Sequence, residues 1–318
     1  MSHAKHCLVL GGRGFIGSHL VDALLAAGHR VRCFDRPNVK QLEAPSSVGV
    51  NPSGNFELLE GDLGNDADIA QALTGCDVCF HLISTTLPQS SNADPVFDIE
   101  SNLIGTLRLL KRAVQAKVGK IVFVSSGGTV YGIPQHTPID ERHPTNPLCS
   151  YGIAKLAIEK YLHLFRELHG LNYTILRLAN PFGERQRTHA SQGAVAVFVG
   201  KALRGETIDI WGDGTVVRDY IHIADVASAL LAAMDHDEAN DVFNIGSGQG
   251  LSLNDILDAI ESVTGHPTQR NYLPGRTFDV PINYLDISHA RRHLGWTPTI
   301  SFAEGLRRFV AWVKQNES

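Results

Sequence analysis

The feature that most constrains the fold is a short apolar run followed by three spaced glycines and an apolar helical pattern. Residues 6–10 read HCLVL, which is typical of a short buried strand. Gly11, Gly14 and Gly17 come next, and the helical pattern covers residues 18–27. Glycines at such a turn let the backbone approach a pyrophosphate, and the helix N-terminus attracts its negative charge. The sequence therefore predicts a strand–turn–helix unit that binds a dinucleotide.

A second predicted strand ends in an acid that bears on the choice of dinucleotide. It covers residues 30–34 and is followed by Asp35, about 20 residues after the glycines. A carboxylate at this place accepts hydrogen bonds from a ribose 2′-hydroxyl and repels a 2′-phosphate. We therefore expect NAD as the cofactor, although the neighbouring Arg36 would suit NADP. Phe15, Ile16 and Arg36 are assigned to the cofactor site together with the glycines and Asp35.

Apolar stretches alternate with helical patterns through about residue 178. The predicted strands cover residues 6–10, 30–34, 56–60, 77–83, 120–125 and 172–178. This alternation predicts an α/β fold with a doubly wound parallel (Rossmann) sheet. We expect an NAD-binding domain over residues 1–180. A smaller lobe over residues 181–318 is expected to bind mainly the substrate, with some segments that return to the sheet.

Composition argues against several other classes of protein. The net charge of −5 at pH 7 disfavours nucleic acid as a partner. No apolar run approaches the roughly 18–20 residues that cross a bilayer, and the N-terminus lacks a signal-peptide pattern, so we expect a cytoplasmic protein without membrane contact. Cys76 and Cys79 have the spacing of a metal-binding pair, but a strand would point their thiols apart and no second pair follows. We therefore expect no metal and no disulfide framework.

Tyr151 and Lys155 stand four residues apart in the segment SYGIAKL, so a helix would place both on one face. A positive charge near a phenol favours the phenolate, and an oxidised nicotinamide ring would add to this effect. A phenolate at neutral pH takes a proton from an alcohol while hydride leaves the same carbon. The pair predicts catalysis with NAD. A non-catalytic NAD-binding scaffold is the remote alternative.

Together these motifs make the chain similar to the extended short-chain dehydrogenase/reductase family, and in particular to its UDP-hexose 4-epimerases. The resemblance runs nearly end to end. Beyond the glycine turn and the Tyr–Lys pair it rests on residues 61–63, 81–82, 102, 125–132, 177–183 and 218–222. It implies that Asp62, Leu63 and Leu82 contact the cofactor. It also implies that Asn102 ties the active-site helix to the strand ends.

The resemblance further implies a serine or threonine hydroxyl beside the catalytic tyrosine. Gly127 occupies the matching position here, so Ser126 becomes the candidate and Thr129 a more distant one. Relatives that expel water from the sugar carry Asp-Glu directly after this hydroxyl, and UDP-glucuronate decarboxylases carry a Glu at the position of Thr129. Gly128 and Thr129 provide no carboxylate, which favours simple oxidation and re-reduction at C4.

A UDP-sugar substrate is implied by matches in the C-terminal half. Arg218 and Arg276 match arginines that bind the diphosphate, a task that suits guanidinium groups. Asn180 matches a ligand of the diphosphate or sugar, and Asp279 matches a ligand of the uridine ribose. Trp211 matches an aromatic residue near the uracil, although a core position for the indole is an equal alternative.

One position is expected to decide whether an N-acetyl group fits. In the family, a tyrosine at this gate excludes the acetamido group and small residues admit it. Asn283 matches the gate, and its amide can hydrogen-bond an acetamido group. We therefore expect UDP-GlcNAc and UDP-GalNAc as substrates, with UDP-glucose and UDP-galactose as further candidates.

The expected reaction is NAD-dependent C4 epimerisation of a UDP-hexose through a transient 4-keto sugar. A UDP-glucuronate 4-epimerase and a keto-sugar reductase would carry the same motifs and stay open as alternatives. Predicted helices over residues 98–116 and 151–168 carry long apolar stripes. In the resembling family such stripes form the interface of a homodimer, whereas a core-facing stripe is the other interpretation.

Overall fold

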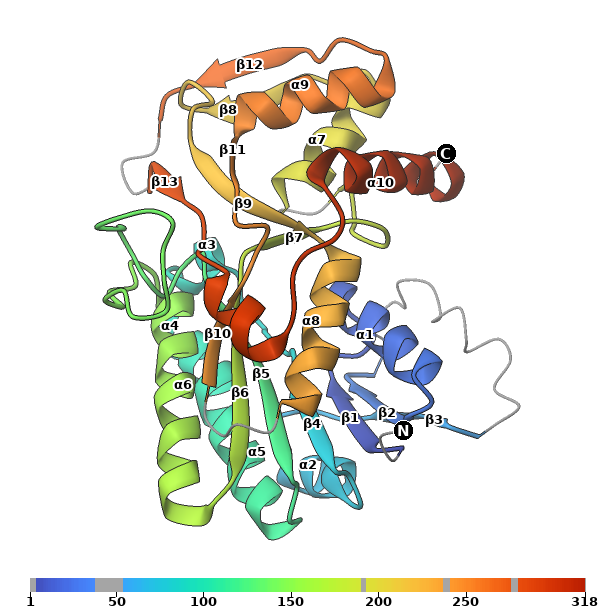
Figure 1. Ribbon diagram of the computed structural model, residues 1–318, viewed down its shortest axis with the longest axis vertical. Coiled ribbons are helices and arrows are strands. Elements are labelled where there is room, and N and C mark those ends of the chain that lie inside the picture. Colours follow the sequence, from blue (N-terminus) through green and yellow to red (C-terminus); the bar gives the residue numbers. More distant parts are fainter. Residues whose placement is uncertain (1–3, 38–53, 190–192, 237–240, 276–279, 318) are drawn as a thin grey trace. The chain divides into compact units, whose positions relative to one another are not determined.

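A seven-stranded sheet organises the N-terminal part of the chain (Figure 1). Its strands lie in the order β10-β6-β5-β4-β1-β2-β3. They are β1 (His6–Leu10), β2 (Arg30–Asp35), β3 (Phe56–Glu60), β4 (Val78–His81), β5 (Lys120–Ser126), β6 (Asn172–Leu178) and β10 (Asp241–Ile245). Five neighbouring strands of this order, β5, β4, β1, β2 and β3, pair in parallel. The predicted α/β fold with a Rossmann sheet is confirmed, and β10 joins this sheet from late in the sequence.

The computed structural model describes residues 4–37, 54–189, 193–236, 241–275 and 280–317. The chain divides into two units, each with its own set of segments. Unit 1 comprises residues 1–130, 147–177 and 227–243, and unit 2 comprises residues 131–146, 178–226 and 244–318. The sheet strands β1 to β5 and almost all of β6 therefore lie in unit 1.

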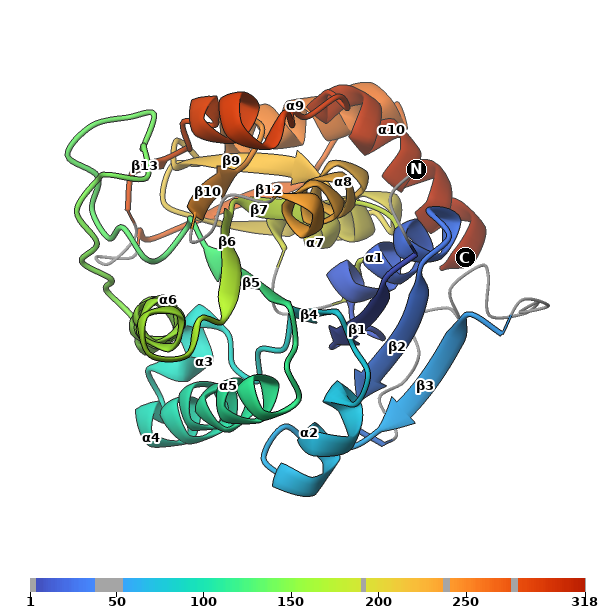
Figure 2. The ribbon, with the colours of Figure 1, turned by 60° about the horizontal axis from the view of Figure 1, so that its bottom comes forward.

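Helices cover both faces of the sheet in unit 1. They are α1 (Phe15–Ala26), α2 (Asp66–Leu73), α3 (Pro88–Ser91), α4 (Pro95–Asp98), α5 (Gly105–Gln115), α6 (Ser150–His169) and most of α8 (Ile223–Asp235). Figure 2 shows α5 and α6 on one face of the sheet and α1 on the other. Local sequence sets the helix ends, as in α6, which stops where Gly170 adopts a left-handed φ of 70°.

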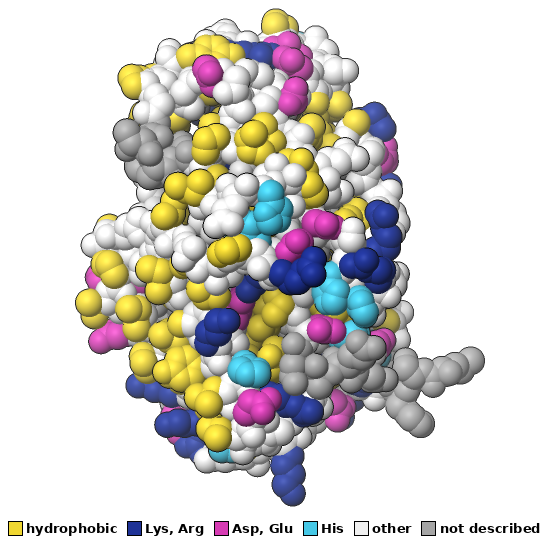
Figure 3. Space-filling view, turned by 60° about the vertical axis from the view of Figure 1, so that its left-hand side comes forward, with side chains coloured by type: hydrophobic (Ala, Val, Ile, Leu, Met, Phe, Trp, Pro, Cys, Tyr) yellow, Lys and Arg dark blue, Asp and Glu magenta, His cyan; other side chains and the backbone are white. Residues whose placement is uncertain are grey.

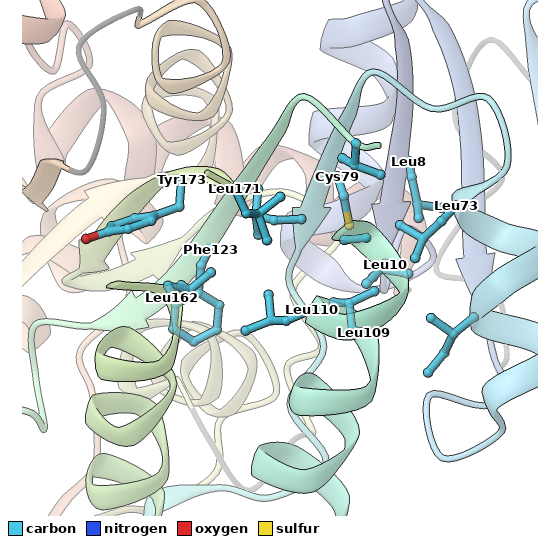
Figure 4. Close-up of a cluster of buried hydrophobic side chains, with 14 of the residues drawn as sticks. Leu8, Leu10, Leu73, Cys79, Leu109, Leu110, Phe123, Leu162, Leu171 and Tyr173 are labelled. Carbon is cyan, nitrogen blue, oxygen red and sulfur yellow. The ribbon is translucent and has the colours of Figure 1, made fainter. Parts of the chain in front are cut away.

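The core of unit 1 fills the space between the sheet and the helices α5 and α6. Apolar residues that alternate along β1 and β5 meet one apolar face of each helix, as Figure 4 shows. The labelled side chains are Leu8, Leu10, Leu73, Cys79, Leu109, Leu110, Phe123, Leu162, Leu171 and Tyr173. Burial of these side chains is the main stabilising contribution to the unit, and it fixes the strand ends that carry the candidate site.

A π-helix, η1 (Ile99–Ile104), lies between α4 and α5. The buried side chain of Asn102 occupies it, with Nδ2 3.2 Å from the Asp98 carbonyl oxygen and Oδ1 2.9 Å from the Thr85 amide nitrogen. The sequence predicts a regular helix over residues 98–116. This prediction is wrong in the first turns, where the wider π-helical turn accommodates these bonds. Such π-turns occur frequently at functional sites.

The described residues of unit 2 form two small sheets with helices packed against them. Its strands are β7 (Asn180–Phe182), β8 (Ile208–Trp211), β9 (Val217–His222), β11 (Gly250–Ser252), β12 (Arg270–Leu273) and β13 (Ile282–Asn283). Its helices include α7 (Ala194–Leu203), α9 (Leu253–Thr264) and α10 (Phe302–Asn316), and η2 (Ala290–Leu294) is a second π-helix. Strand β9 is central, because β7, β11 and β13 all pair with it. A separate apolar core joins α7, α9 and α10.

The described ranges also bear on membrane spans, metal sites and cysteine pairing. None of the helices there has both the length and the apolar character to span a bilayer. The same residues contain no group of three or more side chains suited to a metal ion. The five cysteines are free thiols, and Cys76 and Cys79 are both buried.

Candidate active site

The glycine turn after β1 has the geometry of a cradle for a dinucleotide. Gly11 has a φ of 83°, and a Cβ atom on Gly17 would stand 2.1 Å from the Gly11 carbonyl oxygen. A Cβ atom on Gly12 would stand 2.5 Å from the Cys33 sulfur. Side chains are thus excluded from the turn for steric reasons. Helix α1 begins after Gly14 without a side-chain cap, so its first N–H groups are suited to bind phosphate oxygens.

Asp35 stands at the end of β2, beside the glycine turn. Its Oδ2 accepts the backbone N–H of Arg13 at 3.1 Å, and its Oδ1 accepts the N–H of Arg36 at 3.0 Å. These bonds hold the carboxylate in place for a ribose hydroxyl. Among the residues present, the glycine cradle and this acid fit NAD.

The remaining residues assigned to the cofactor come from neighbouring strand ends. Asp62 follows β3, and its Oδ1 accepts the Gly64 N–H at 2.6 Å. Leu63 is buried, and the Leu82 amide, directly after β4, donates to the Leu10 carbonyl at 3.2 Å. Because the carboxyl ends of parallel strands meet at one edge of a sheet, these residues gather beside Gly11 and Asp35.

Tyr151 and Lys155 lie one turn apart near the start of α6. The Lys155 ammonium nitrogen donates to the Val124 carbonyl oxygen at 2.9 Å and lies 5.6 Å from the centre of the Tyr151 ring. Gly152 allows the helix to approach its neighbours closely, since a Cβ atom there would stand 2.9 Å from the Pro147 Cβ. The predicted helical pairing of Tyr151 with Lys155 is therefore present.

The ionisation of this pair differs from the sequence-based expectation. Burial raises the pKa of the Tyr151 phenol to about 12. Desolvation lowers the pKa of Lys155 to about 8, against the carboxylates of Asp98 and Glu159, which raise it. Desolvation of the phenol thus acts against the phenolate form that Lys155 is expected to favour.

Two hydroxyls, on Ser126 and Thr129, were expected beside the phenol, and neither makes a hydrogen bond to Tyr151 in the described part of the chain. The Ser126 side chain is half-buried and has no hydrogen-bond partner among the described residues. Thr129 Oγ1 is buried and likewise lacks a partner within those ranges.

Apart from Ser126, which lies in unit 1, the described residues assigned to a UDP-sugar lie in unit 2. Arg218 on β9 donates from Nη1 to the carbonyl oxygens of Val217 at 2.8 Å and Val280 at 2.6 Å. Asn283 on β13 is buried and pairs in register with Arg218. The side chain of Asn180 donates to the Asp219 carbonyl at 2.9 Å.

Three further assignments have different outcomes. Trp211 ends β8 with 42% of its surface exposed, which excludes the alternative of a core position. Arg276 and Asp279 lie outside the described residues. The structure therefore brings Arg218 and Asn283 together on paired strands, and it leaves the second predicted arginine without a described position.

Known proteins match this chain over nearly its whole length. A putative UDP-glucose 4-epimerase from Methanocaldococcus jannaschii is 37% identical over 311 residues, which cover 97% of this chain and 98% of the relative. A crystal structure of UDP-glucose 4-epimerase with UDP-glucose from Thermotoga maritima has a TM-score of 0.91 and 36% identity, and the match covers 98% of this chain and 100% of that one.

A third similar protein is named for an N-acetylated sugar. The UDP-N-acetylglucosamine 4-epimerase from Methanobrevibacter ruminantium, solved in complex with UDP-N-acetylmuramic acid, has a TM-score of 0.91 and 30% identity, and the match covers 99% of both chains. The family model described as the NAD dependent epimerase/dehydratase family matches residues 7–246. With a cradle that fits NAD and a Tyr–Lys pair at the same sheet edge, this chain belongs to the NAD dependent epimerase/dehydratase family.

Proposed function

We propose that this protein is an NAD-dependent 4-epimerase of UDP-hexoses. The observation that carries the proposal is the Tyr151–Lys155 pair at the end of the sheet that also holds the glycine cradle and Asp35. A buried ammonium one turn from a phenol, next to a dinucleotide site, is suited to alcohol oxidation at a sugar carbon. The UDP-sugar 4-epimerases among the similar proteins support this assignment.

In the proposed mechanism, Tyr151 takes the proton of the C4 hydroxyl and later returns a proton to the same oxygen. Lys155 stays fixed to the Val124 carbonyl and stabilises the phenolate through its charge. When bound, NAD+ supplies the acceptor and donor of the C4 hydride and a positive ring that favours the phenolate. The 4-keto sugar turns about its diphosphate linkage between the two half-reactions, so the returning hydrogen reaches the opposite face.

The proposed role of unit 2 is to hold the UDP group. Arg218 and Arg276 would bind the diphosphate, since guanidinium groups match phosphate oxygens in geometry and charge. Asn180 would contact the diphosphate or sugar, and Asp279 the uridine ribose. Trp211 presents an exposed indole, which is suited to stack against a uracil ring.

Substrate choice is proposed to include N-acetylated sugars. Asn283 at the gate position is smaller than tyrosine and carries an amide that can pair with an acetamido group. We therefore propose interconversion of UDP-GlcNAc with UDP-GalNAc, and of UDP-glucose with UDP-galactose. Gly128 and Thr129 provide no carboxylate for loss of water, which favours epimerisation over dehydration.

A homodimer is part of the proposal and is supported by a second apolar stripe on α6. Ile158, Leu162 and Phe165 of this helix face the core, whereas Leu164 and Leu168 are exposed. Other exposed apolar side chains on the same unit include Val96, Phe97, Ile99, Ile104, Ile153 and Tyr161. Figure 3, which brings the α4 and α6 side of unit 1 forward, shows hydrophobic side chains gathered there. Such a patch on a folded protein is typical of a protein interface.

The reaction is tested by incubating the purified protein with UDP-GlcNAc, and separately with UDP-glucose, without added reduced cofactor. The expected result is conversion of each sugar to its galacto epimer. NMR signals of the H4 and anomeric protons monitor this conversion. Conversion of UDP-glucuronate, with no conversion of UDP-GlcNAc or UDP-glucose, would identify a UDP-glucuronate 4-epimerase instead. Stoichiometric consumption of reduced cofactor with a keto-sugar would identify a reductase, and no turnover of any of these would favour a non-catalytic scaffold.

Replacement of the proposed base tests the mechanism. Tyr151→Phe keeps the ring that packs near Lys155 and removes the ionisable group. We expect its NAD content to equal that of the wild type while turnover falls by about 10³-fold. Near-normal turnover in this variant would refute the assignment of Tyr151 as the base.

A further inference from the structure

Two carboxylates stand side by side at the ends of neighbouring strands in unit 1. Asp35 is the last residue of β2 and Glu60 is the last residue of β3, and the two are partners in the parallel register. Neighbouring strands of a sheet lie about 4.8 Å apart, and register partners point to the same face. The glycine turn follows β1, which lies on the other side of β2. Both acids therefore lie at the edge of the sheet that carries the dinucleotide cradle.

The side chain of Arg13, in the glycine turn, crosses the end of β2 to reach the second acid. The backbone N–H of Arg13 donates to Asp35 Oδ2 at 3.1 Å, and its Nη1 donates to Glu60 Oε1 at 2.9 Å. Because β2 lies between β1 and β3, a residue in the turn after β1 reaches Glu60 only over the carboxyl end of β2. The guanidinium is therefore held across the strand end at which Asp35 stands.

The Arg13 side chain is more shielded from solvent than its partner. Its exposed fraction is 13%, against 47% for Glu60. Its Nε is buried and has no hydrogen-bond partner among the described residues. Arg36, the other arginine beside Asp35, is exposed. Since solvent weakens charge interactions, Arg13 is the stronger of the two arginines as a ligand for an anion, and Glu60 occupies it.

NAD and NADP differ in the group that they present to this strand end. A carboxylate at the end of the second strand accepts the ribose 2′-hydroxyl of NAD, whereas an arginine nearby accommodates the 2′-phosphate of NADP. Both residue types are present here, in Asp35 and Arg13. A guanidinium binds carboxylate and phosphate in the same geometry, so a carboxylate that is already paired with it competes with a phosphate. The ion pair with Glu60 therefore bears on which dinucleotide this arginine favours.

We propose that Glu60 is a specificity-determining residue for the dinucleotide. By pairing with Arg13, it keeps this guanidinium from binding a 2′-phosphate, so the site selects NAD over NADP. Selection therefore depends on two acids from neighbouring strands, of which only Asp35 is expected from local spacing. The inference rests on the NAD dependence of the proposed 4-epimerase, and it concerns binding of the dinucleotide rather than a step of the reaction.

The test measures competition between the two dinucleotides for the site. The purified protein, loaded beforehand with NAD or with NADP, is incubated with both at equal concentration until the two preparations agree. Unbound nucleotide is then removed, and the bound NADP/NAD ratio is measured by chromatography. We expect Glu60→Gln to raise this ratio about tenfold over that of the wild type. Because both dinucleotides compete for the same folded molecules, the ratio does not depend on the folded fraction of a variant. An unchanged ratio would overturn the inference.

Glu57→Gln is the matched control. Glu57 lies on the same strand as Glu60, its Oε2 accepts Arg32 Nε at 2.8 Å, and 49% of its side chain is exposed. Arg32 also donates to the Ala72 carbonyl oxygen at 2.8 Å, away from the strand end. We expect the bound NADP/NAD ratio of Glu57→Gln to stay within about twofold of the wild type. An equal rise in both variants would contradict the inference, because it would reflect net charge rather than the pair with Arg13.

A double variant tests whether the freed arginine is the group that binds the 2′-phosphate. Arg13→Leu combined with Glu60→Gln removes the guanidinium and keeps the backbone N–H that donates to Asp35. The bound NADP/NAD ratio should return close to that of the wild type, and a rise that persists would refute the role of Arg13. A wild type that binds neither dinucleotide would refute the proposed function, whereas the ratio in a wild type that binds NAD tests only the ion pair.

Discussion

The ammonium nitrogen of Lys155 lies 5.6 Å from the centre of the Tyr151 ring and is anchored on the Val124 carbonyl oxygen at 2.9 Å. The lysine is thus held by the end of β5. The Lys155 side chain is buried, and its charge acts on the phenol through space. Charge interactions are strong in such surroundings, so the protonation state of Lys155 matters for the reaction.

Lys155 should therefore impose an alkaline limit on activity. Desolvation lowers its pKa to about 8, so the ammonium form prevails below that pH and the neutral amine above it. We expect kcat to fall as the pH rises through about 8, measured as a pH profile of epimerisation. Lys155→Arg keeps the positive charge at all these pH values. Its pH profile should therefore lack the alkaline fall in kcat, even if its kcat is lower. A wild-type profile that stays flat beyond pH 8 would contradict the role of the charge.

Removal of the buried charge on Glu159 should strongly destabilise unit 1. Glu159 Oε2 accepts Arg177 Nη2 at 2.6 Å, and its Oε1 accepts the Ser125 hydroxyl at 2.5 Å. Both charged side chains are buried. Glu159→Gln leaves the guanidinium without its counter-charge, which costs roughly 3–5 kcal/mol. Urea denaturation of the variant and the wild type measures this difference.

A matched control comes from an exposed carboxylate. Glu304 on α10 pairs with Arg307 and Arg308 at the surface. Glu304→Gln should leave the free energy of unfolding almost unchanged, because solvent screens such pairs. Equal effects of the two substitutions would show that burial does not set the strength of the Glu159 interaction.

His81 should make the protein less stable in acid. Desolvation lowers its pKa from 6.5 to about 3. Thr106 Oγ1 donates to the Asn102 carbonyl at 2.6 Å, so His81 Nε2, 2.8 Å from Thr106 Oγ1, carries the proton, and Nδ1 is buried without a described partner. A second proton therefore has no acceptor on that side.

The sign of the pH effect follows from this shift. Between pH 6.5 and 3 the unfolded chain binds a proton at His81 that the folded protein rejects. The stabilisation is complete above pH 6.5 and decreases by about 1.4 kcal/mol for each pH unit below it. Denaturation curves at several pH values should show this slope as the difference between wild type and His81→Gln. Parallel pH dependence of the two proteins would contradict it.

Asn283→Tyr should change substrate preference. Asn283 is buried beside Arg218, so a larger ring at this place takes up space that an acetamido group would need. We expect turnover of UDP-GlcNAc to fall at least tenfold more than turnover of UDP-glucose. Asn283→Ser keeps the site small and should retain both activities. Equal losses of turnover for both sugars in Asn283→Tyr would refute the assignment of Asn283 as the gate.

Leu164→Lys should disrupt the proposed homodimer. Leu164 is 43% exposed on the outer stripe of α6 and faces away from the core. A charge there has little effect on the folded subunit, but it opposes burial in an apolar interface. Light scattering coupled to size exclusion should give a dimer for the wild type and a monomer for the variant. A matched substitution on α9, Asp258→Lys, should leave the mass unchanged. A monomeric wild type would refute the interface.

The sequence by itself determined the order of strands and helices and the dinucleotide cradle. Every predicted strand of the N-terminal half was found, because alternating apolar runs leave few ways to bury a core. Gly17 and Asp35 were found from local spacing, since the turn and the strand end are formed by neighbouring residues. Tyr151 and Lys155 meet for the same reason, because four residues make about one helical turn.

The tertiary structure alone decided which distant side chains brace the helix that carries the phenol and in which direction the pKa of the phenol shifts. Asp98 and Ser150 form their hydrogen bond across 52 residues of sequence, only after α4 and α6 have packed. Burial, which depends on the whole surrounding fold, raises the pKa of Tyr151 against the expectation from Lys155. Local spacing fixes turns and helical faces, whereas contacts between distant segments and the loss of solvent arise only from packing.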